Sequence, residues 1–537
     1  MTRPEWMRGK VTTWLTTVDH KRVGILYVGT SLVFLFLGGL LALLLRMQLS
    51  TPTETFLGKT SYAQVVTVHG TTMLFLVVAP ILAGLGSYLA PLLIGARDVA
   101  FPRLNALGYW LFLLGGVVLY SSFLAKGGPA GTGWTGSVPL AEQAAAPGNG
   151  VNLLLLALCL LTLSTLCAAI TIVVTVVNMR AEGMSWMRMP PFVWSLLVFA
   201  VLLLVVLPSF AVGLTMLLLD REGGTHFFIA SQGGSTVLYR HAFWFLAHPE
   251  LYLLILPPLG IVSEVLPVFS RKPIAHYRAV VCSTVALGAL FALFWALRTF
   301  VFGLTEFVHY ASIGLSLAIA AAACVLVFAW LATLWRGELR FDSPLQFALG
   351  FLFLFAFGGL SGIALALFSH QWQETYHVVA QLHYALYGSS LFAILAGLHY
   401  WWPKLHGRLL DERLARATFW LLFVGFNVTF FVQFLLGHLG MERRADGYGK
   451  SGAWETYNLI STVGSWIIAA GLIVFLTNIL RTQRSGRRAG NDPWHGDTLE
   501  WYTTSPPPEH NFDTVPAVDS ARPLSDLRQR LTEPHAR

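Results

Sequence analysis

The sequence predicts an all-α membrane protein with twelve transmembrane helices, on three observations. Hydrophobic residues make up 55% of the chain and charged residues only 12%, and the mean hydropathy is +0.64. The apolar residues gather into runs of roughly 20 residues or more, the length an α-helix needs to cross about 30 Å of hydrocarbon. These runs lack the two-residue alternation of membrane β-barrels, so helices are expected.

The twelve runs follow one another along the whole chain. Their approximate bounds are 23–46, 65–95, 106–125, 151–177, 193–219, 242–268, 277–303, 308–336, 345–369, 376–402, 416–438 and 457–481. We therefore divide the chain into an N-terminal segment (1–22), a twelve-helix domain (23–482) and a tail (483–537). The tail is charged and contains Ser-Pro-Pro-Pro at 505–508, so an extended segment with little core of its own is expected.

The basic residues indicate how the chain is oriented. Lys and Arg are concentrated near the two termini and in alternate connections, namely 97–105, 178–192, 269–278, 335–344 and 403–416. By the positive-inside rule this side is cytoplasmic, so both termini are predicted in the cytoplasm of a bacterial-type inner membrane. The first run is long enough to span, so a cleavable signal peptide is not expected.

The composition also excludes several classes of function. The formal charge of +8 is explained by membrane orientation, and we find no nucleic-acid signature. The four cysteines have no CxxC spacing and lie in apolar runs, which argues against a disulfide framework or a thiolate metal site; they are Cys159, Cys167, Cys282 and Cys324.

Two histidines within predicted helices are candidates to bind a cofactor. An ionisable imidazole at membrane depth is costly unless it is paired or coordinated. His69 and His383 belong to different predicted helices, so they could place imidazoles on both faces of a heme iron, a low-spin arrangement suited to electron transfer. Gln381 has no imidazole lone pair, so it is not expected to ligate as His383 does.

The motif His-Pro-Glu-Leu-Tyr at 248–252 adds three chemical groups to one helix. His248 and Tyr252 lie one turn apart, and the proline opens the backbone hydrogen-bond ladder. A buried Glu250 would stay protonated unless a cation or water solvates it, so it could pass protons; the alternative is a structural glutamic acid. Arg443 and Arg444 could clamp anions such as heme propionates or anchor a helix to headgroups.

Several further motifs, taken together with these residues, make the chain resemble subunit I of the heme-copper oxidases, of the cytochrome c oxidase type. The motifs are Val-Asp-His-Lys-Arg at 18–22, Gly-Ala-Arg-Asp-Val-Ala-Phe-Pro-Arg-Leu-Asn at 95–105, the 248–252 motif, Phe-Ser-Arg-Lys-Pro at 269–273, Tyr-Trp-Trp-Pro-Lys at 400–404, Leu-Glu-Trp at 499–501 and Ser-Pro-Pro-Pro-Glu-His-Asn-Phe at 505–512. They cover essentially the whole chain. The resemblance implies a pseudo-threefold bundle of twelve helices.

The resemblance also implies roles for residues that are present. The family's low-spin heme ligands fall on His69 and His383. Its contacts to the heme propionates fall on Trp134, Arg443 and Arg444, and its arginine near the heme formyl edge matches Arg46. Parts of its main proton route fall on Asp98, Asn105 and Glu250, and Ser263 remains from its second route. Ser87 stands where an asparagine is usual. Gln373 and Glu374 replace a His-Asp pair at a magnesium site, where Glu374 could still ligate.

The family's oxygen-reducing site is largely absent from this sequence. Gln381 stands at the position of the high-spin heme ligand, and Leu297-Arg298 replaces a pair of copper-binding histidines. His248 is then the only copper-site histidine left, and an arginine cannot donate a lone pair. The membrane lysine of the second proton route is Leu326, with Ala323 in place of a nearby hydroxyl residue. Glu250 and Tyr252 remain.

These residues predict one low-spin heme, of a-type or b-type, with the second heme and the copper missing or bound abnormally. The leading hypothesis is a divergent paralogue that relays electrons within a respiratory complex, with subunit II-like and III-like partners and cytochrome c or a similar donor. The alternatives are an active terminal oxidase that translocates protons, and a cofactor-free structural or assembly subunit. Two further alternatives stay open: His377 replaces Gln381 as a ligand, and Arg298 pairs with Glu306, Tyr252 or a propionate.

Overall fold

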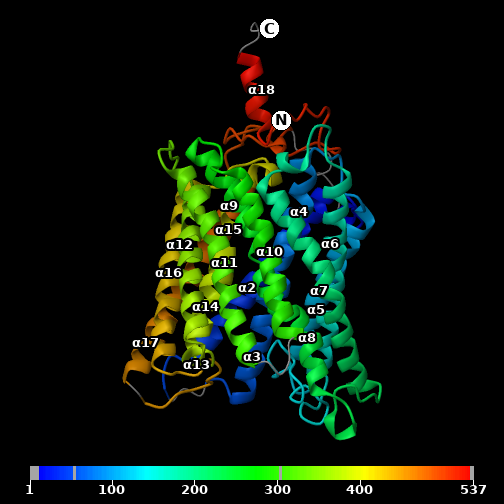
Figure 1. Ribbon diagram of the computed structural model, residues 1–537, viewed down its shortest axis with the longest axis vertical. Helices are drawn as coiled ribbons and strands as arrows, with labels where there is room; N and C mark the ends of the chain where they lie inside the picture. The colour runs from blue at the N-terminus through cyan, green and yellow to red at the C-terminus, as the bar shows by residue number, and fades with distance from the viewer. Residues whose placement is uncertain (1–10, 53–55, 301–304, 451, 533–537) are drawn as a thin grey trace.

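The chain folds into a bundle of upright α-helices (Figure 1). The structure is a computed structural model that describes residues 11–52, 56–300, 305–450 and 452–532, with the backbone alone for 244–252, 298–300, 305 and 369–370. In these described ranges the only β-pairing consists of two isolated bridges, Thr375 with Glu442 and Arg408 with Arg488. The prediction of an all-α membrane bundle is therefore confirmed.

Eleven helical stretches of the described chain are long and apolar enough to cross a membrane. The helices that build the bundle are α2 (His20–Gln48), α3 (Lys59–Thr71) continuing through the π-helix η2 (Thr72–Val78) into α4 (Ala79–Ile94), α5 (Pro102–Ser121), α6 (Gly150–Asn178), α7 (Pro191–Glu222), α8 (Thr236–Leu253), α9 (Leu256–Ser270), α10 (Tyr277–Phe300), α11 (Thr305–Leu334), α12 (Ser343–Leu367), α14 (Tyr376–Leu382) continuing through the π-helix η6 (His383–Gly388) into α15 (Ser389–His406), α16 (Glu412–His438) and α17 (Gly452–Ser485). The short α1 (Val11–Leu15), α13 (Ser369–Trp372) and α18 (Pro523–Thr532) lie outside these spans.

The predicted span over 242–268 is interrupted at residues 254–255, where the chain divides into α8 and α9. Pro257 and Pro258 occupy the first turn of α9 and have no N–H to donate to the carbonyls of residues 253 and 254. The α-helical ladder therefore ends at Leu253 and restarts at Leu256. Together the two helices still cover the stretch that the hydropathy pattern indicated.

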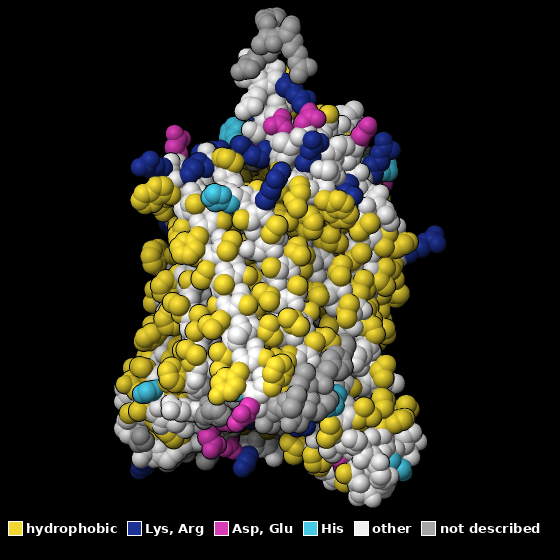
Figure 2. Space-filling view, in the orientation of Figure 1, with side chains coloured by type: hydrophobic (Ala, Val, Ile, Leu, Met, Phe, Trp, Pro, Cys, Tyr) yellow, Lys and Arg dark blue, Asp and Glu magenta, His cyan; other side chains and the backbone are white. Residues whose placement is uncertain are grey.

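The two ends of the bundle differ in charge. Both termini lie at the same end, and Figure 2 shows Lys and Arg side chains gathered there above a broad belt of hydrophobic side chains. At this end the connections between helices carry the basic residues that the sequence pattern placed on one side. We call it the terminal end and the opposite one the far end.

The tail is packed into the terminal end instead of extending freely from it. Trp494, Leu499 and Trp501 are buried and join the hydrophobic core of the bundle. The Trp501 indole donates to the Tyr400 hydroxyl (2.7 Å), and the Lys404 ammonium donates to the Thr503 carbonyl (2.8 Å). The tail, for which little core of its own was expected, thus shares the core of the bundle. Its apolar side chains cover α15, where Trp501 packs on Tyr400.

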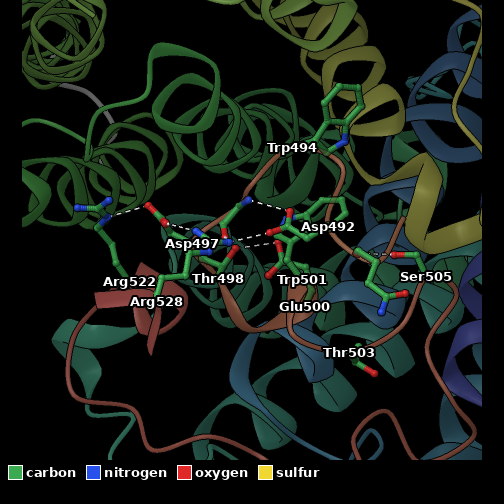
Figure 3. A network of polar contacts seen from close by, with 12 residues as sticks. Asp492, Trp494, Asp497, Thr498, Glu500, Trp501, Thr503, Ser505, Arg522 and Arg528 are labelled. Atoms are coloured by element: carbon green, nitrogen blue, oxygen red, sulfur yellow. Dashed lines mark hydrogen bonds and ion pairs between the residues drawn. The ribbon is translucent and has the colours of Figure 1, made fainter. Parts of the chain in front are cut away.

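Ion pairs and hydrogen bonds also connect residues within the tail (Figure 3). Arg528 of α18 forms ion pairs with Asp492 (2.7 Å) and Asp497 (3.3 Å), and Arg522 pairs with Asp497 (2.8 Å). Below this layer Glu500 is completely buried and accepts from the Thr498 hydroxyl (2.8 Å). The tail thus forms a cap whose outer layer is ionic and whose inner layer is apolar.

Candidate cofactor site

His69 is held in a fixed orientation by a neighbouring helix. It lies in the last turn of α3, and its Nδ1 is 3.0 Å from the carbonyl oxygen of Gly38 on α2. A Cβ added at Gly38 would lie 2.9 Å from Met73 and Thr72 atoms, so only glycine lets α2 approach this closely. Because a carbonyl only accepts, Nδ1 carries the proton and the Nε2 lone pair is free.

His383 has the same arrangement on a second stretch of chain. It opens the π-helix η6, and its Nδ1 donates to the Val379 carbonyl at 2.7 Å. Its ring stacks on Phe430 of α16, with centroids 4.1 Å apart and planes 17° from parallel. A backbone carbonyl partner on one nitrogen is the usual second contact of a metal-ligating histidine, because it fixes the tautomer and the ring orientation.

The fold brings these two imidazoles together. His69 and His383 lie within electrostatic interaction range of each other although 314 positions separate them in the chain. Within the described part of the chain neither Nε2 has a hydrogen-bond partner. A π-helical segment adjoins each histidine, η2 beginning three residues after His69 and η6 at His383. Such segments are frequent at functional sites because they displace one face of the helix.

Trp134 covers the helix next to His69. Its Cδ1 would lie 3.3 Å from a Cβ added at Gly70, so the indole packs directly on the backbone of α3. The ring also contacts Phe75 and Phe243 at centroid distances of 6.5 and 5.8 Å. The tryptophan that the sequence placed at the heme edge is therefore beside His69.

Arg46 is buried toward the far end, two turns of α2 beyond Gly38. Its Nη2 donates to the carbonyl oxygen (2.9 Å) and side-chain oxygen (3.0 Å) of Asn458, while its Nε is buried with no partner in the described protein. A buried N–H without an acceptor is costly, so this N–H lacks an acceptor that another group could provide. An oxygen-bearing edge of a bound group would satisfy it.

Two tyrosines that we did not predict accompany Arg46. Tyr62 and Tyr376 are buried and lie within interaction range of its guanidinium. Tyr62 precedes His69 by seven residues, and Tyr376 precedes His383 by seven, so each tyrosine lies two helical turns from its histidine on the same face. The shared spacing was visible in the sequence and could have identified them.

Arg443 lies beside the start of α14. It forms a two-point contact with the Glu374 carboxylate, at 2.8 and 2.9 Å, and its backbone N–H donates to the Glu374 carbonyl at 3.0 Å. Its Nε is also buried without a partner, whereas Arg444 is exposed. The carboxylate of Glu374, which the sequence left open as a metal ligand, is engaged by Arg443.

The positions at which the sequence predicts a departure from the family are only partly described. Gln381 is half-buried, and its Nε2 lies against Gly362 of α12. Leu297 is half-buried on α10, and Leu326 is completely buried in the apolar core. The side chains of His248, Glu250, Tyr252 and Arg298 lie outside the described residues, so their predicted roles stay predictions. No group of three or more potential metal ligands occurs among the described side chains.

His377, the possible substitute for Gln381, is packed among aromatic rings. It stacks on Trp372 with centroids 4.5 Å apart and planes 16° from parallel, and it contacts Phe434 edge-on at 4.8 Å. Its backbone faces Gly437 of α16 so closely that a Cβ there would clash at 2.1 Å. Its Nε2 is buried without a partner.

Asn105, one of the predicted proton-route residues, belongs to a short hydrogen-bonded chain near the terminal end. Asn105 donates to the Ser87 hydroxyl at 2.7 Å, so serine provides the partner where asparagine is usual. His20 connects the Ser87 carbonyl (2.9 Å) to the side chain of Asn511 in the tail (3.1 Å). Asp98 is half-buried and accepts from the N–H of Val99. The role of Asn511 was not predicted, because it depends on tail docking.

Ser263 belongs to a different part of the bundle. Its hydroxyl donates to the Leu259 carbonyl (2.8 Å) and accepts from the Trp330 indole (2.9 Å). Trp330 lies one turn after Leu326 on α11, and both side chains are completely buried. The Ser263 hydroxyl therefore both donates and accepts a hydrogen bond in an apolar environment.

Comparisons with known proteins agree with this arrangement. The family model described as "Cytochrome C and Quinol oxidase polypeptide I" matches residues 22–467. A putative cytochrome c oxidase subunit 1-beta of Streptomyces coelicolor is 43% identical over 518 residues, covering 96% of this chain and 90% of the relative. Cytochrome c oxidase subunit 1 of Bacillus subtilis is 42% identical over 514 residues, covering 95% and 82%.

A solved structure has the same fold. A heme-copper terminal oxidase dimer determined by cryo-electron microscopy contains a chain that superposes with a TM-score of 0.73 at 18% identity, covering 88% of this chain and 85% of that one. The fold is thus that of a heme-copper oxidase membrane bundle. Within this class the chain belongs to the cytochrome c oxidase subunit I family, a family of multi-pass integral membrane proteins that carry heme and copper.

Proposed function

We propose that the chain is an electron-transfer subunit with one low-spin heme, of a-type or b-type, between His69 and His383. The observation that carries the proposal is the matched pair of imidazoles, each with Nδ1 on a backbone carbonyl and Nε2 free. When bound, the heme supplies one-electron redox chemistry, and two histidine ligands leave no open position for oxygen.

The surrounding residues would hold and orient the group. The unpartnered Nε of Arg46 suits a formyl or other oxygen-bearing edge, and that of Arg443 suits a propionate, with Arg444 and Trp134 nearby. Tyr62 and Tyr376 would keep the Arg46 guanidinium in place. Phe430 stacks on the His383 ring and Trp134 packs on α3 beside His69, so aromatic rings would line the bound group.

We further propose that oxygen reduction has been lost. Gln381 offers an amide in place of an imidazole, Leu297 offers no donor, and Leu326 cannot carry a proton. A site with His248 as its only copper-site histidine would not retain copper against competing ligands. Glu250 and Tyr252 would then be remnants. The bonded pair of Asn105 and Ser87, together with Asp98, would serve structure or a partial proton route.

The proposed setting is a respiratory complex of a bacterial-type inner membrane. The basic terminal end would face the cytoplasm. Subunit II-like and III-like chains would be the partners, and cytochrome c or a similar protein on the outer face would donate electrons to the low-spin heme.

The alternative is an active terminal oxidase, which the relatives' designation as cytochrome c oxidase subunit 1 favours. Metal analysis and a pyridine hemochrome spectrum of the purified complex decide between the two. Our proposal expects one heme per chain, copper well below one per chain in this subunit and no cyanide-sensitive oxygen uptake. Two hemes and one copper with cyanide-sensitive uptake would establish the oxidase, and the absence of any heme would indicate a structural or assembly subunit.

A further inference from the structure

A cavity of about 550 Å³ opens at the terminal end of the bundle. It lies between the first turns of α12 and α16, the last turn of α17 and the loop that follows α17. Arginines dominate its charged lining: four of them face three carboxylates. None of the family motifs or proposed cofactor residues belongs to it.

The carboxylates of the lining already have partners. Asp411 accepts from two backbone N–H groups at the start of α16, at 2.9 and 3.1 Å. Glu412 accepts from both the N–H and the hydroxyl of Ser343 at the start of α12, each at 3.0 Å. Asp342 pairs with Arg340 at 2.9 Å. Asp411 and Glu412 therefore accept hydrogen bonds at the starts of α16 and α12, and Asp342 is paired with Arg340.

The other three arginines are not neutralised in this way. In the described part of the chain, the side chains of Arg481, Arg487 and Arg488 form no hydrogen bond or ion pair, and all three are exposed. The lining carries four guanidiniums and three carboxylates, so it keeps one excess positive charge, and a bound anion could contact the three arginines that have no carboxylate partner among the described residues. Guanidinium groups match phosphate oxygens in both charge and two-point geometry.

The loop that presents two of these arginines is fixed to the bundle. The Leu409 N–H donates to the Arg487 carbonyl (2.9 Å), and the Ala489 N–H donates to the Gly407 carbonyl (3.1 Å). Arg408 and Arg488 face each other across an isolated antiparallel bridge. A binding site gains affinity when its backbone is already ordered, because binding then costs less conformational entropy.

The neighbouring surface indicates a lipid and not a soluble phosphate. Leu480, directly before Arg481, is 50% exposed, and Leu476 is 36% exposed one turn further into the span. Trp420 of α16 is also exposed. An apolar helix surface thus leads up to the arginines at the level where lipid headgroups meet water.

We propose that this cavity binds the phosphodiester headgroup of an anionic phospholipid, with Arg481, Arg487 and Arg488 on the phosphate oxygens. The acyl chains would lie along the exposed face of α17. Basic pockets between transmembrane helices are suited to such headgroups. The inference is independent of the heme proposal, because no residue is shared between the two sites.

The test measures lipid binding to the purified, delipidated complex by native mass spectrometry. Phosphatidylglycerol, phosphatidylcholine and inorganic phosphate are the three probes. The variant R481Q/R487Q/R488Q removes the cavity arginines. The control R413Q/R416Q/R484Q removes three exposed arginines from α16 and α17 that do not line the cavity, with the same change in net charge.

We expect the unmodified complex to prefer phosphatidylglycerol over phosphatidylcholine and the cavity variant to bind it at least about tenfold more weakly, a change of about 1.4 kcal/mol. The control should bind as the unmodified complex does. Equal weakening in both variants, or no lipid preference, would overturn the proposal, and competition by millimolar inorganic phosphate would assign the site to a soluble anion. If the triple variant fails to fold, R487Q and R488Q are compared singly with R484Q.

Discussion

The surroundings of the histidine pair and the tail cap differ in how fully their polar side chains are hydrogen-bonded. Around His69 and His383, each ring uses one nitrogen to fix its position and leaves the other free, and buried Nε atoms of Arg46 and Arg443 have no partner. In the tail cap, Lys404 donates to three backbone carbonyls and Asn511 bonds on both sides. A buried polar atom without a partner marks a candidate position for an external group but does not establish one by itself, since Glu500 Oε2 in the cap and His399 Nε2 in the core are also unpartnered among the described residues.

The largest expected effect tests the histidine pair directly. His69→Ala or His383→Ala removes an axial imidazole, so we expect heme absorbance per chain to fall by more than about tenfold, as loss of a direct ligand exceeds the effect of losing a supporting contact. A pyridine hemochrome spectrum of the purified complex measures it.

His399 provides the matched control for this experiment. Its Nδ1 also donates to the carbonyl four residues earlier, at 2.7 Å, but its ring packs on Phe347 of α12 in the core. His399→Leu should leave the heme content unchanged. Equal loss of heme in all three variants would show that the histidine pair has no special role.

The second effect concerns the buried acid of the tail cap. Burial raises the pKa of the Glu500 carboxyl from its ordinary 4.5 to about 7. The folded cap therefore favours the protonated acid, so docking is strongest below about pH 4.5 and weakens as the pH rises to about 7, by up to roughly 3 kcal/mol. Protease cleavage of the tail should accelerate over this range.

The variant Glu500→Gln tests whether Glu500 itself causes the pH dependence of tail docking. The amide keeps the shape of the protonated acid without its titration, so cleavage of the variant should vary little between pH 5 and 7.5. Lys404 and Glu264 also lie within electrostatic range of Glu500. If the variant keeps the full pH dependence, one of these neighbours is responsible and not Glu500.

The third effect tests whether the hydrogen bond between Asn105 and Ser87 stabilises the fold. Asn105→Ala leaves the Ser87 hydroxyl without its 2.7 Å donor, and we expect a loss of about 1–2 kcal/mol in the free energy of unfolding in detergent. Ser87→Ala should cost a similar amount. The double variant should cost less than the sum, and strict additivity would show that the two side chains do not interact.

The smallest effect is expected for the outer ionic layer of the cap. Arg528→Gln breaks contacts with Asp492 and Asp497, but its side chain is 41% exposed, so tail docking should weaken by less than about 1 kcal/mol. High salt should reduce the difference between the variant and the unmodified protein. A larger, salt-independent effect would mean that Arg528 is needed for packing.

The comparison also shows which parts of the site were accessible from the sequence. His69, His383, Trp134 and Arg46 were predicted from their motif positions. The fold brings the two histidines within interaction range and packs Trp134 beside His69, whereas Arg46 lies two turns of α2 beyond Gly38. Their roles as ligands and contacts stay predictions. Tyr62 and Tyr376 were missed, although each precedes its histidine by seven residues; their contact with Arg46 shows why that spacing matters.

The sequence by itself determined the helices and the family. Helix formation in a membrane depends on local length and hydropathy, so the runs of apolar residues were sufficient, and the motifs lie along the whole chain. The break before Pro257-Pro258 was also encoded locally, although the hydropathy pattern concealed it. Only the tertiary structure decided that Arg443 meets Glu374, that Asn511 reaches His20 and that three arginines surround one cavity. These contacts join residues far apart in the chain, and their geometry depends on how the helices pack, which no local pattern specifies.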